Sequence, residues 1–272
     1  MEQTISKQNK LSYKLSILIR QDGLSFCVSQ QNPAKVISFS TEEFSDKKTP
    51  EELLHFIENY IEYSLAEYEI EDVLAIYGNQ LYSFVPRPIF KEEHLTDYLK
   101  YSVKILKTDV ASFDELSNQQ INNVYIPYVN INNYLFENFG AFTYKHASTL
   151  LTEFALQNST DKTKVYVNFQ NSSFDVCVVS KANLLLCNSF IHETAEDFLY
   201  YLLFTFEQLS LSTAETPVFL MGNIEKESDY YKLLYKYIKE VIFVERIKNI
   251  ETSTMNSESL HTHHLLLSSI CE

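Results

Sequence analysis

Two stretches of the chain, residues 15–41 and 165–191, carry the same pattern of apolar and polar positions and align without gaps at a shift of 150 residues. Each stretch consists of short β-rich runs separated by polar turns, the first of which are Gln21-Asp22-Gly23 and Asn171-Ser172-Ser173. Polar triplets between such runs are typical of β-hairpins. The pattern therefore predicts three strands in each stretch.

The elements that follow the two stretches also repeat. Thr49-Pro50-Glu51-Glu52 and Thr194-Ala195-Glu196-Asp197 each place a threonine N-cap three residues before an acid, and apolar residues at helical spacing come next. This arrangement is typical of the start of an amphipathic helix. Each predicted helix is followed by an apolar run that ends in Gly-Asn, at residues 73–79 and 217–223. Runs of this kind favour parallel strands that are buried on both faces.

The chain thus contains a strand-strand-strand-helix-strand-helix unit twice. We expect an N-terminal lobe over residues 1–157, with an insertion at about 101–146, and a C-terminal lobe over residues 158–272 that ends in a polar tail. The remaining pattern predicts strands at 103–106, 124–128, 142–146 and 241–245, a loop at 112–120, and helices near 92–100 and at 130–138, 148–156 and 229–239. The helix at 148–156 is expected to cross between the lobes, and the segment at 248–259 is expected to be mobile.

Composition narrows the classes of partner. The formal net charge is −14 and the pI is about 5.0, which disfavours nucleic-acid phosphates and anionic membrane surfaces but not a basic protein. No apolar run approaches the roughly 20 residues of a membrane span, and the polar first ten residues lack a leader pattern. We therefore expect a cytoplasmic protein. The four cysteines form no C-x-x-C pair and are expected to be reduced, buried thiols.

A histidine-rich segment and a tyrosine-rich segment each allow a purely structural interpretation as well as a functional one. His261, His263 and His264 lack the further ligands of a metal site, so we expect a floppy tail and no metal centre. The predicted helix at 229–239 carries tyrosines on more than one face with lysines between them. It either packs its tyrosines on the sheet with their hydroxyls in water or offers an interaction surface.

A duplicated β-β-β-α-β-α unit with a linking helix resembles the actin, hexokinase and sugar-kinase superfamily over roughly residues 13–247. The layout is most similar to the pilus-assembly and cell-division members, and it suggests an uncharacterised bacterial family with the actin-like ATPase fold. The resemblance implies an α/β protein with two ribonuclease-H-like lobes. It also implies an ATP site in the cleft between them, built from three glycine-bearing turns.

Each of these three turns departs from the superfamily pattern, and the whole chain has only 4 glycines. Gln21-Asp22-Gly23 begins with glutamine where an aspartate would serve the metal. Asn171-Ser172-Ser173 has asparagine for aspartate and serine for glycine, and Gly222-Asn223 lacks the second glycine of the adenosine motif. Mg²⁺ usually needs one or two carboxylates besides the phosphates. The resemblance therefore implies a degenerate cofactor site at these eight residues, with no catalytic residue and no metal ligand assigned.

Three hypotheses about function follow. The first is a non-catalytic interaction or scaffold module that binds a protein partner and has no cofactor. The second is an ATP-binding switch or kinase, with ATP and Mg²⁺ in an atypical cleft that includes Asp22, Gly23, Ser172, Ser173 and Gly222. The third is self-assembly into a homo-oligomer.

Overall fold

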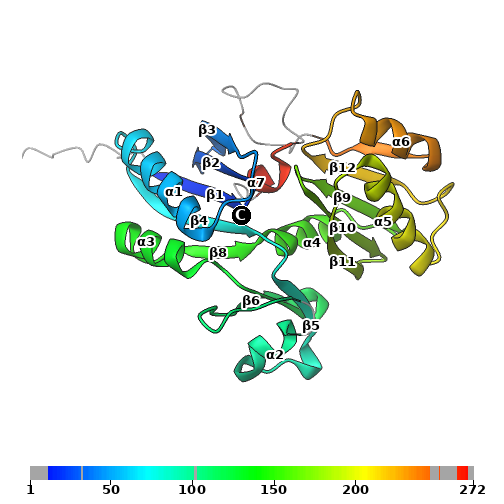
Figure 1. Ribbon diagram of the computed structural model, residues 1–272, viewed down its shortest axis with the longest axis horizontal. Helices are drawn as coiled ribbons and strands as arrows, with labels where there is room; N and C mark the ends of the chain where they lie inside the picture. Colours follow the sequence, from blue (N-terminus) through cyan, green and yellow to red (C-terminus); the bar gives the residue numbers. More distant parts are fainter. Residues whose placement is uncertain (1–11, 32, 101–102, 246–250, 252–261, 269–272) are drawn as a thin grey trace, which may run out of the picture.

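The computed structural model describes residues 12–31, 33–100, 103–245, 251 and 262–268. Figure 1 shows two lobes side by side along the long axis, with a smaller unit projecting from the region between them. The helix at residues 147–157 runs from the first lobe to the second, as expected for the linking helix.

The first lobe is built on a five-stranded sheet with the order β3-β2-β1-β4-β8. Its strands are β1 (Tyr13–Arg20), β2 (Gly23–Gln30), β3 (Lys35–Glu43), β4 (Ile70–Gly78) and β8 (Thr143–His146). β1 is antiparallel to β2 and parallel to β4, as the sequence predicts. Helices α1 (Pro50–Ser64) and α3 (Val129–Phe139) cover one face, where Leu53 and Ile57 of α1 join Ile131 and Leu135 of α3 in an apolar core.

The second lobe repeats this arrangement with the order β11-β10-β9-β12-β13. Its strands are β9 (Lys164–Phe169), β10 (Ser173–Ser180), β11 (Asn183–Ile191), β12 (Val218–Gly222) and β13 (Val241–Phe243). Helices α5 (Ala195–Gln208) and α6 (Asp229–Tyr237) cover one face. Tyr230 and Tyr231 of α6 pack against the core of this lobe, whereas Tyr235 and Tyr237 are exposed. Matching strand orders confirm the predicted α/β fold of two duplicated lobes.

Both predicted capping boxes are present. Thr49 and Thr194 each accept a hydrogen bond from the backbone N–H three residues on, and the side chains of Glu52 and Asp197 accept one from the N-cap backbone. Local sequence alone therefore sets where α1 and α5 begin, because each box satisfies two helix-end N–H groups from within four residues.

The projecting unit contains a three-stranded sheet with the order β5-β7-β6, formed by β5 (Tyr82–Pro86), β7 (Ile121–Tyr125) and β6 (Ser112–Leu116). It also holds the short helices η1 (Arg87–Ile89), η2 (Glu92–His94), α2 (Leu95–Leu99) and η3 (Ser117–Gln119). Two predictions were wrong here. The polar 112–120 segment includes β6, because its register with β7 supplies ladder bonds that its composition does not signal. Residues 103–106, which were predicted to form a strand, are irregular in the structure, and Leu106 N donates to Asp109 Oδ2 at 2.7 Å.

The last helix of each copy contacts the sheet of the other lobe. Helix α4 (Ala147–Gln157) follows β8 and contacts β10 and β11, whereas α7 (His264–Ser268) follows the second lobe and contacts β1 and β2. The two helices also contact each other. Around them lies an apolar core fed by both lobes, here called the shared core: Leu18, Cys27, Val36, Leu74, Ile76, Ala147, Leu150, Leu151, Ala155, Tyr166, Cys177, Val179, Met221, Leu265, Leu266 and Leu267.

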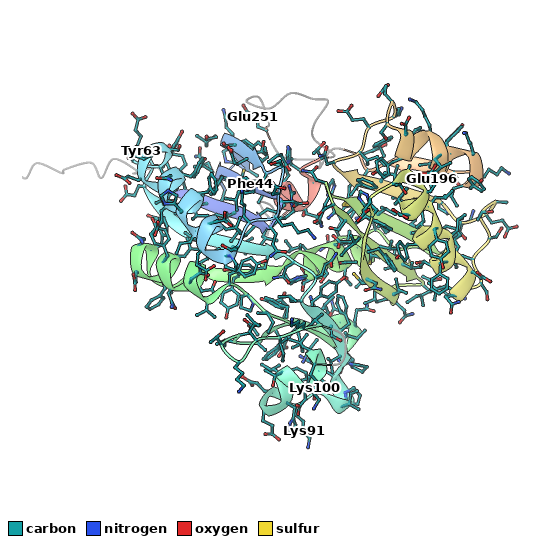
Figure 2. The ribbon with its side chains drawn as sticks, in the orientation of Figure 1. Phe44, Tyr63, Lys91, Lys100, Glu196 and Glu251 are labelled. Carbon is teal, nitrogen blue, oxygen red and sulfur yellow. The ribbon has the colours of Figure 1, made fainter. Side chains whose placement is uncertain are left out.

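The C-terminal segment therefore differs from the expected polar, floppy tail. His264 is buried with its ring 4.4 Å from that of Phe154, and the His263 ring lies 4.5 Å from that of Phe39. These ring contacts and the burial of Leu265, Leu266 and Leu267 hold the segment against both lobes. Residues 248–250 and 252–259 of the predicted mobile stretch, and His261, lie outside the described residues. Glu251 is described: its backbone bonds to β3 and its carboxylate pairs with Lys35 at 2.9 Å (Figure 2).

Candidate functional site

The first predicted turn, Gln21-Asp22-Gly23, joins β1 to β2 at the end of the first lobe that faces the second. Arg20 precedes it and donates from Nε to Asp22 Oδ1 at 3.2 Å and from a terminal nitrogen to Glu43 Oε1 at 2.9 Å. A Cβ built on Gly23 would lie 2.8 Å from the same guanidinium. The space at this glycine is therefore filled by the side chains of Arg20 and Glu43 and by the carbonyl oxygen of Glu42.

The second turn, Asn171-Ser172-Ser173, joins β9 to β10 and touches the first turn directly. Ser172 Oγ donates to Asp22 Oδ2 at 3.2 Å, and Asn171 Nδ2 donates to Glu43 Oε2. Both bonds join residues of opposite lobes. The turns that would cradle phosphates in this fold are thus bonded to each other.

The third predicted motif, Gly222-Asn223, ends β12 beside the second turn. Gly222 has φ +86°, and a Cβ on it would lie 2.1 Å from the carbonyl oxygen of Phe169, so only glycine fits. Asn223 N donates to Phe169 O at 2.7 Å, and its Nδ2 donates to Asn171 Oδ1. All three sequence motifs therefore meet in one hydrogen-bonded cluster.

A cavity of about 620 Å³ opens beside this cluster, on the side of the first lobe and the projecting unit. Four of the eight predicted residues line it, namely Gln21, Asp22, Ser172 and Ser173, whereas Gly23, Asn171, Gly222 and Asn223 do not. The rest of the lining comes from the β3–α1 loop and the start of α1, from the β4–β5 loop, from the β7–α3 loop and the start of α3, from residues 104–109 and from Gln170.

Sequence reasoning missed the cationic and aromatic parts of this lining. Lys47 and Lys104 are its basic residues, and Tyr128 and Asn130 come from the start of α3. Asn130 Nδ2 donates to Pro50 O at 2.7 Å, which ties the starts of α1 and α3 together. No motif marks these positions: Lys47 and Lys104 lie in irregular segments, and Tyr128 and Asn130 lie at the start of a helix that the fold brings to the cavity.

A buried carboxylate, Asp175 of β10, lies behind the second turn. It accepts hydrogen bonds from Asn168 Nδ2 at 3.0 Å, from Gln170 Nε2 at 2.9 Å and from Ser189 Oγ. Burial raises its pKa despite these bonds. The Tyr82 hydroxyl lies 2.8 Å from Ser189 Oγ, so the network also joins the projecting unit to the second lobe.

A second buried carboxylate, Asp114 of β6, anchors the projecting unit to the start of α4. It accepts hydrogen bonds from Tyr125 Oη at 2.9 Å, Thr149 Oγ1 at 2.6 Å and the backbone N–H of His146 at 2.8 Å. Burial raises its pKa. Both carboxylates have protein donors on their oxygens and therefore act as structural acceptors.

The His146 ring is also buried in this region. Its Nε2 lies 3.0 Å from Asn79 O, and its Nδ1 lies 3.1 Å from the backbone N of Ser148. A neutral ring protonated on Nε2 satisfies both contacts, because it donates to the carbonyl and accepts from the amide. Burial lowers the pKa of His146 to about 3.

The donor set at the cluster does not fit a magnesium nucleotide. Gln21 and Asn171 are amides where the metal would need carboxylates. The one acid of the two turns, Asp22, already accepts from Arg20 and Ser172. Within the described part of the chain, no group of three or more His, Cys, Asp or Glu residues is placed to hold a metal ion. No helix among these residues is long and apolar enough to cross a membrane.

Comparison with known proteins places the fold and the family. The chain belongs to the family described as "Protein of unknown function (DUF3822)", which matches residues 2–241. A Bacteroides thetaiotaomicron protein with an actin-like ATPase fold and unknown function is similar over 97% of this chain and 98% of its own, with 20% identity and a TM-score of 0.80. No curated protein matches the sequence significantly.

Two further solved structures have the same fold. A chain of the PilM–PilN type IV pilus biogenesis complex is 13% identical, with 95% of this chain and 98% of that chain covered and a TM-score of 0.62. The ethanolamine utilization protein EutJ from Carboxydothermus hydrogenoformans is 7% identical, with 95% and 89% covered and a TM-score of 0.55. The chain therefore has the actin-like ATPase fold expected from its repeat.

Proposed function

We propose that this chain is a non-catalytic member of the actin-like fold that works by binding a protein partner. The observation that carries the proposal is the direct bond between the two turns, from Ser172 Oγ to Asp22 Oδ2. Nucleotide phosphates would have to separate this pair. They would also meet the acids Asp22 and Glu43, whose charges Arg20 only partly offsets.

The shared core supports a rigid scaffold. Leu266 of α7 is fully buried against the first lobe, and Cys177 of β10 is buried beside Thr152 of α4. Moving the lobes apart would expose apolar surface at about 25 cal/mol for each Å². A nucleotide-driven opening of the lobes therefore carries a large cost, whereas a partner can bind to a fixed surface without that motion.

The nature of the partner follows from charge and from the fold relatives. A net charge of −14 favours a basic partner surface, because complementary charge speeds association and excludes acidic competitors. The similar chain in the PilM–PilN complex is an example of this fold within a protein complex. We place the protein in the cytoplasm, and nucleic acid and membrane are not proposed as partners.

Calorimetric titration with ATP, with and without Mg²⁺, tests the proposal. We expect no binding tighter than about 1 mM, a free energy of about −4 kcal/mol. Mg²⁺-dependent binding in the micromolar range, or phosphate release that Mg²⁺ stimulates, would contradict it. A Gln21→Asp/Asn171→Asp variant, which returns the two carboxylates, serves as a comparison: gain of Mg²⁺-dependent binding in this variant alone would identify the amides as the cause of the loss.

The second candidate function is an ATP-binding switch or kinase. It is favoured by the cavity of about 620 Å³, which Gln21, Asp22, Ser172 and Ser173 line together. In that case the bond between Ser172 and Asp22 must break when the ligand enters, so Ser172→Ala should leave nucleotide affinity unchanged or raise it. If wild-type protein and Ser172→Ala both fail to bind ATP in the titration, this candidate is excluded.

A further inference from the structure

The sheet of the second lobe ends in a long strand without charge. β11 is nine residues long, contains no Asp, Glu, Lys or Arg, and pairs on one side with β10. Within the described part of the chain, no strand pairs with its other side. Natural proteins usually protect such an edge with charges, proline or a covering segment, because unpaired backbone groups attract another strand.

The corresponding strand of the first lobe is protected in these ways. β3 carries Lys35, Glu42 and Glu43, and the chain itself covers part of its outer edge. The backbone N–H of Val36 donates to Glu251 O at 2.9 Å, and Glu251 N donates to the carbonyl of Ala34 at 3.0 Å. Two strands at equivalent positions therefore differ: one edge takes an added segment from the same chain, and the other is uncharged.

The outer edge of β11 is interrupted near its start, where Leu185 forms a bulge against β10. The side chain of Gln119 reaches across from the projecting unit, where its Oε1 accepts from Leu184 N at 3.2 Å and its Nε2 donates to Ala182 O at 2.8 Å. Beyond this contact Leu185 and Ile191 are 47% and 51% exposed. Two large aliphatic side chains thus flank the central part of the free edge.

Exposed aromatic side chains on α5 extend the same surface. Tyr201 of α5 stacks on Phe190 of β11 with ring centroids 5.2 Å apart, so this side of the helix lies over β11. Phe204, three residues on, lies toward the same side and is 44% exposed, and Tyr200 next to it is 63% exposed. The uncharged edge and the aromatic helix face therefore adjoin.

We propose that a second copy of this chain docks on this surface, with the two β11 strands paired antiparallel about a two-fold axis. An antiparallel strand pair is self-complementary, so one edge serves both copies. Two copies of charge −14 repel each other, and an uncharged strand is where they can approach at least electrostatic cost. The two five-stranded sheets then form one continuous sheet of ten strands.

The regular part of β11 defines a register, because β11 pairs with β10 without interruption from Leu186 to Ile191. An axis at Asn188 sets Leu186, two residues before it, opposite Phe190 of the second copy, two residues after it. Both apolar side chains then meet as cross-strand pairs, twice in the dimer. The two α5 helices then flank the two-fold axis, and Tyr200 and Phe204 of each copy lie beside that axis. This pairing is independent of whether the cleft binds nucleotide.

Sedimentation velocity of the full chain, from about 1 to 100 μM, tests the interface, and we expect a concentration-dependent dimer. Ile191→Lys and Leu185→Lys each place two charges in the two-fold contact and should raise the dissociation constant at least about tenfold. Tyr63→Lys is the matched control. Tyr63 is 75% exposed at the far end of the first lobe (Figure 2), so its replacement should leave the dimer unchanged.

Cross-linking tests the register separately. Asn188→Cys places a thiol at the axis, and mild oxidation should give a covalent dimer on a non-reducing gel, whereas wild-type protein with its native cysteines should not. Far-UV circular dichroism confirms that each variant is folded. A wild-type chain that stays monomeric throughout the concentration range, or edge variants that dimerise as well as Tyr63→Lys, would overturn the proposal. A dimer without the Asn188→Cys cross-link would overturn the register.

Discussion

Replacement of Gly222 by alanine should strongly destabilise the second lobe. The residue has φ +86°, where an L-residue costs roughly 1–2 kcal/mol. Its new Cβ would lie 2.1 Å from the carbonyl oxygen and 2.5 Å from the nitrogen of Phe169, both backbone atoms of the neighbouring strand. Since neither atom belongs to a side chain that can rotate away, β12 must shift relative to β9.

The size of the loss follows from these contacts. Overpacking of this kind costs about 1–3 kcal/mol. The shift also endangers the bond from Asn223 N to Phe169 O, which is 2.7 Å long and worth about 1 kcal/mol. With the backbone strain, the expected loss is about 3–6 kcal/mol, a large part of the 5–15 kcal/mol that typically holds a domain together.

Gly140→Ala provides the control, because Gly140 also has a positive φ, +75°, but nothing lies within 4 Å of its built Cβ. This variant should lose only the strain, about 1–2 kcal/mol. Urea unfolding followed by far-UV circular dichroism measures both, since the chain has no tryptophan. Equal losses in the two variants would show that the contact with Phe169 has no effect and would refute the reasoning.

Three further predictions concern single side chains. Burial lowers the pKa of His146 to about 3, so as the pH drops the unfolded state takes up the His146 proton before the folded state does. The free energy of unfolding should therefore fall between about pH 6.5 and pH 3, by up to about 1.4 kcal/mol per pH unit. A His146→Gln variant with the same pH slope would contradict this. Leu266→Ala, at a fully buried position of α7, should cost about 2–5 kcal/mol in urea unfolding, whereas a loss near zero would mean that α7 is not docked. Thr194→Ala removes a capping box and should cost about 1 kcal/mol in the same assay; no change would mean that α5 needs no cap.

Much of the fold could be predicted because residues that are close in the sequence determine where its elements begin and end. The turn at Gln21-Asp22-Gly23, the capping boxes at Thr49 and Thr194 and the strand ending at Gly222 each depend on residues within a few positions of one another. Repetition of these signals in the same order was enough to predict two lobes of the actin-like fold.

The predictions failed where a segment takes its structure from a distant partner. Residues 112–116 form a strand because β7 pairs with them, although their own composition is polar. The helix at 264–268 was missed because its apolar run is short, and it is buried only through contacts with β1, β2 and α4. Propensity is a weak guide when the stabilising contacts come from elsewhere in the chain.

The sequence by itself determined that the three predicted turns depart from the superfamily pattern, because amides and a serine stand where that pattern has aspartates and glycines. Only the tertiary structure decided what those residues do. Asp22 and Ser172 are 150 positions apart, and their bond depends on how the two lobes sit against each other. That arrangement is set by the shared core around α4 and α7, whose burial is a property of the assembled lobes and of no local stretch.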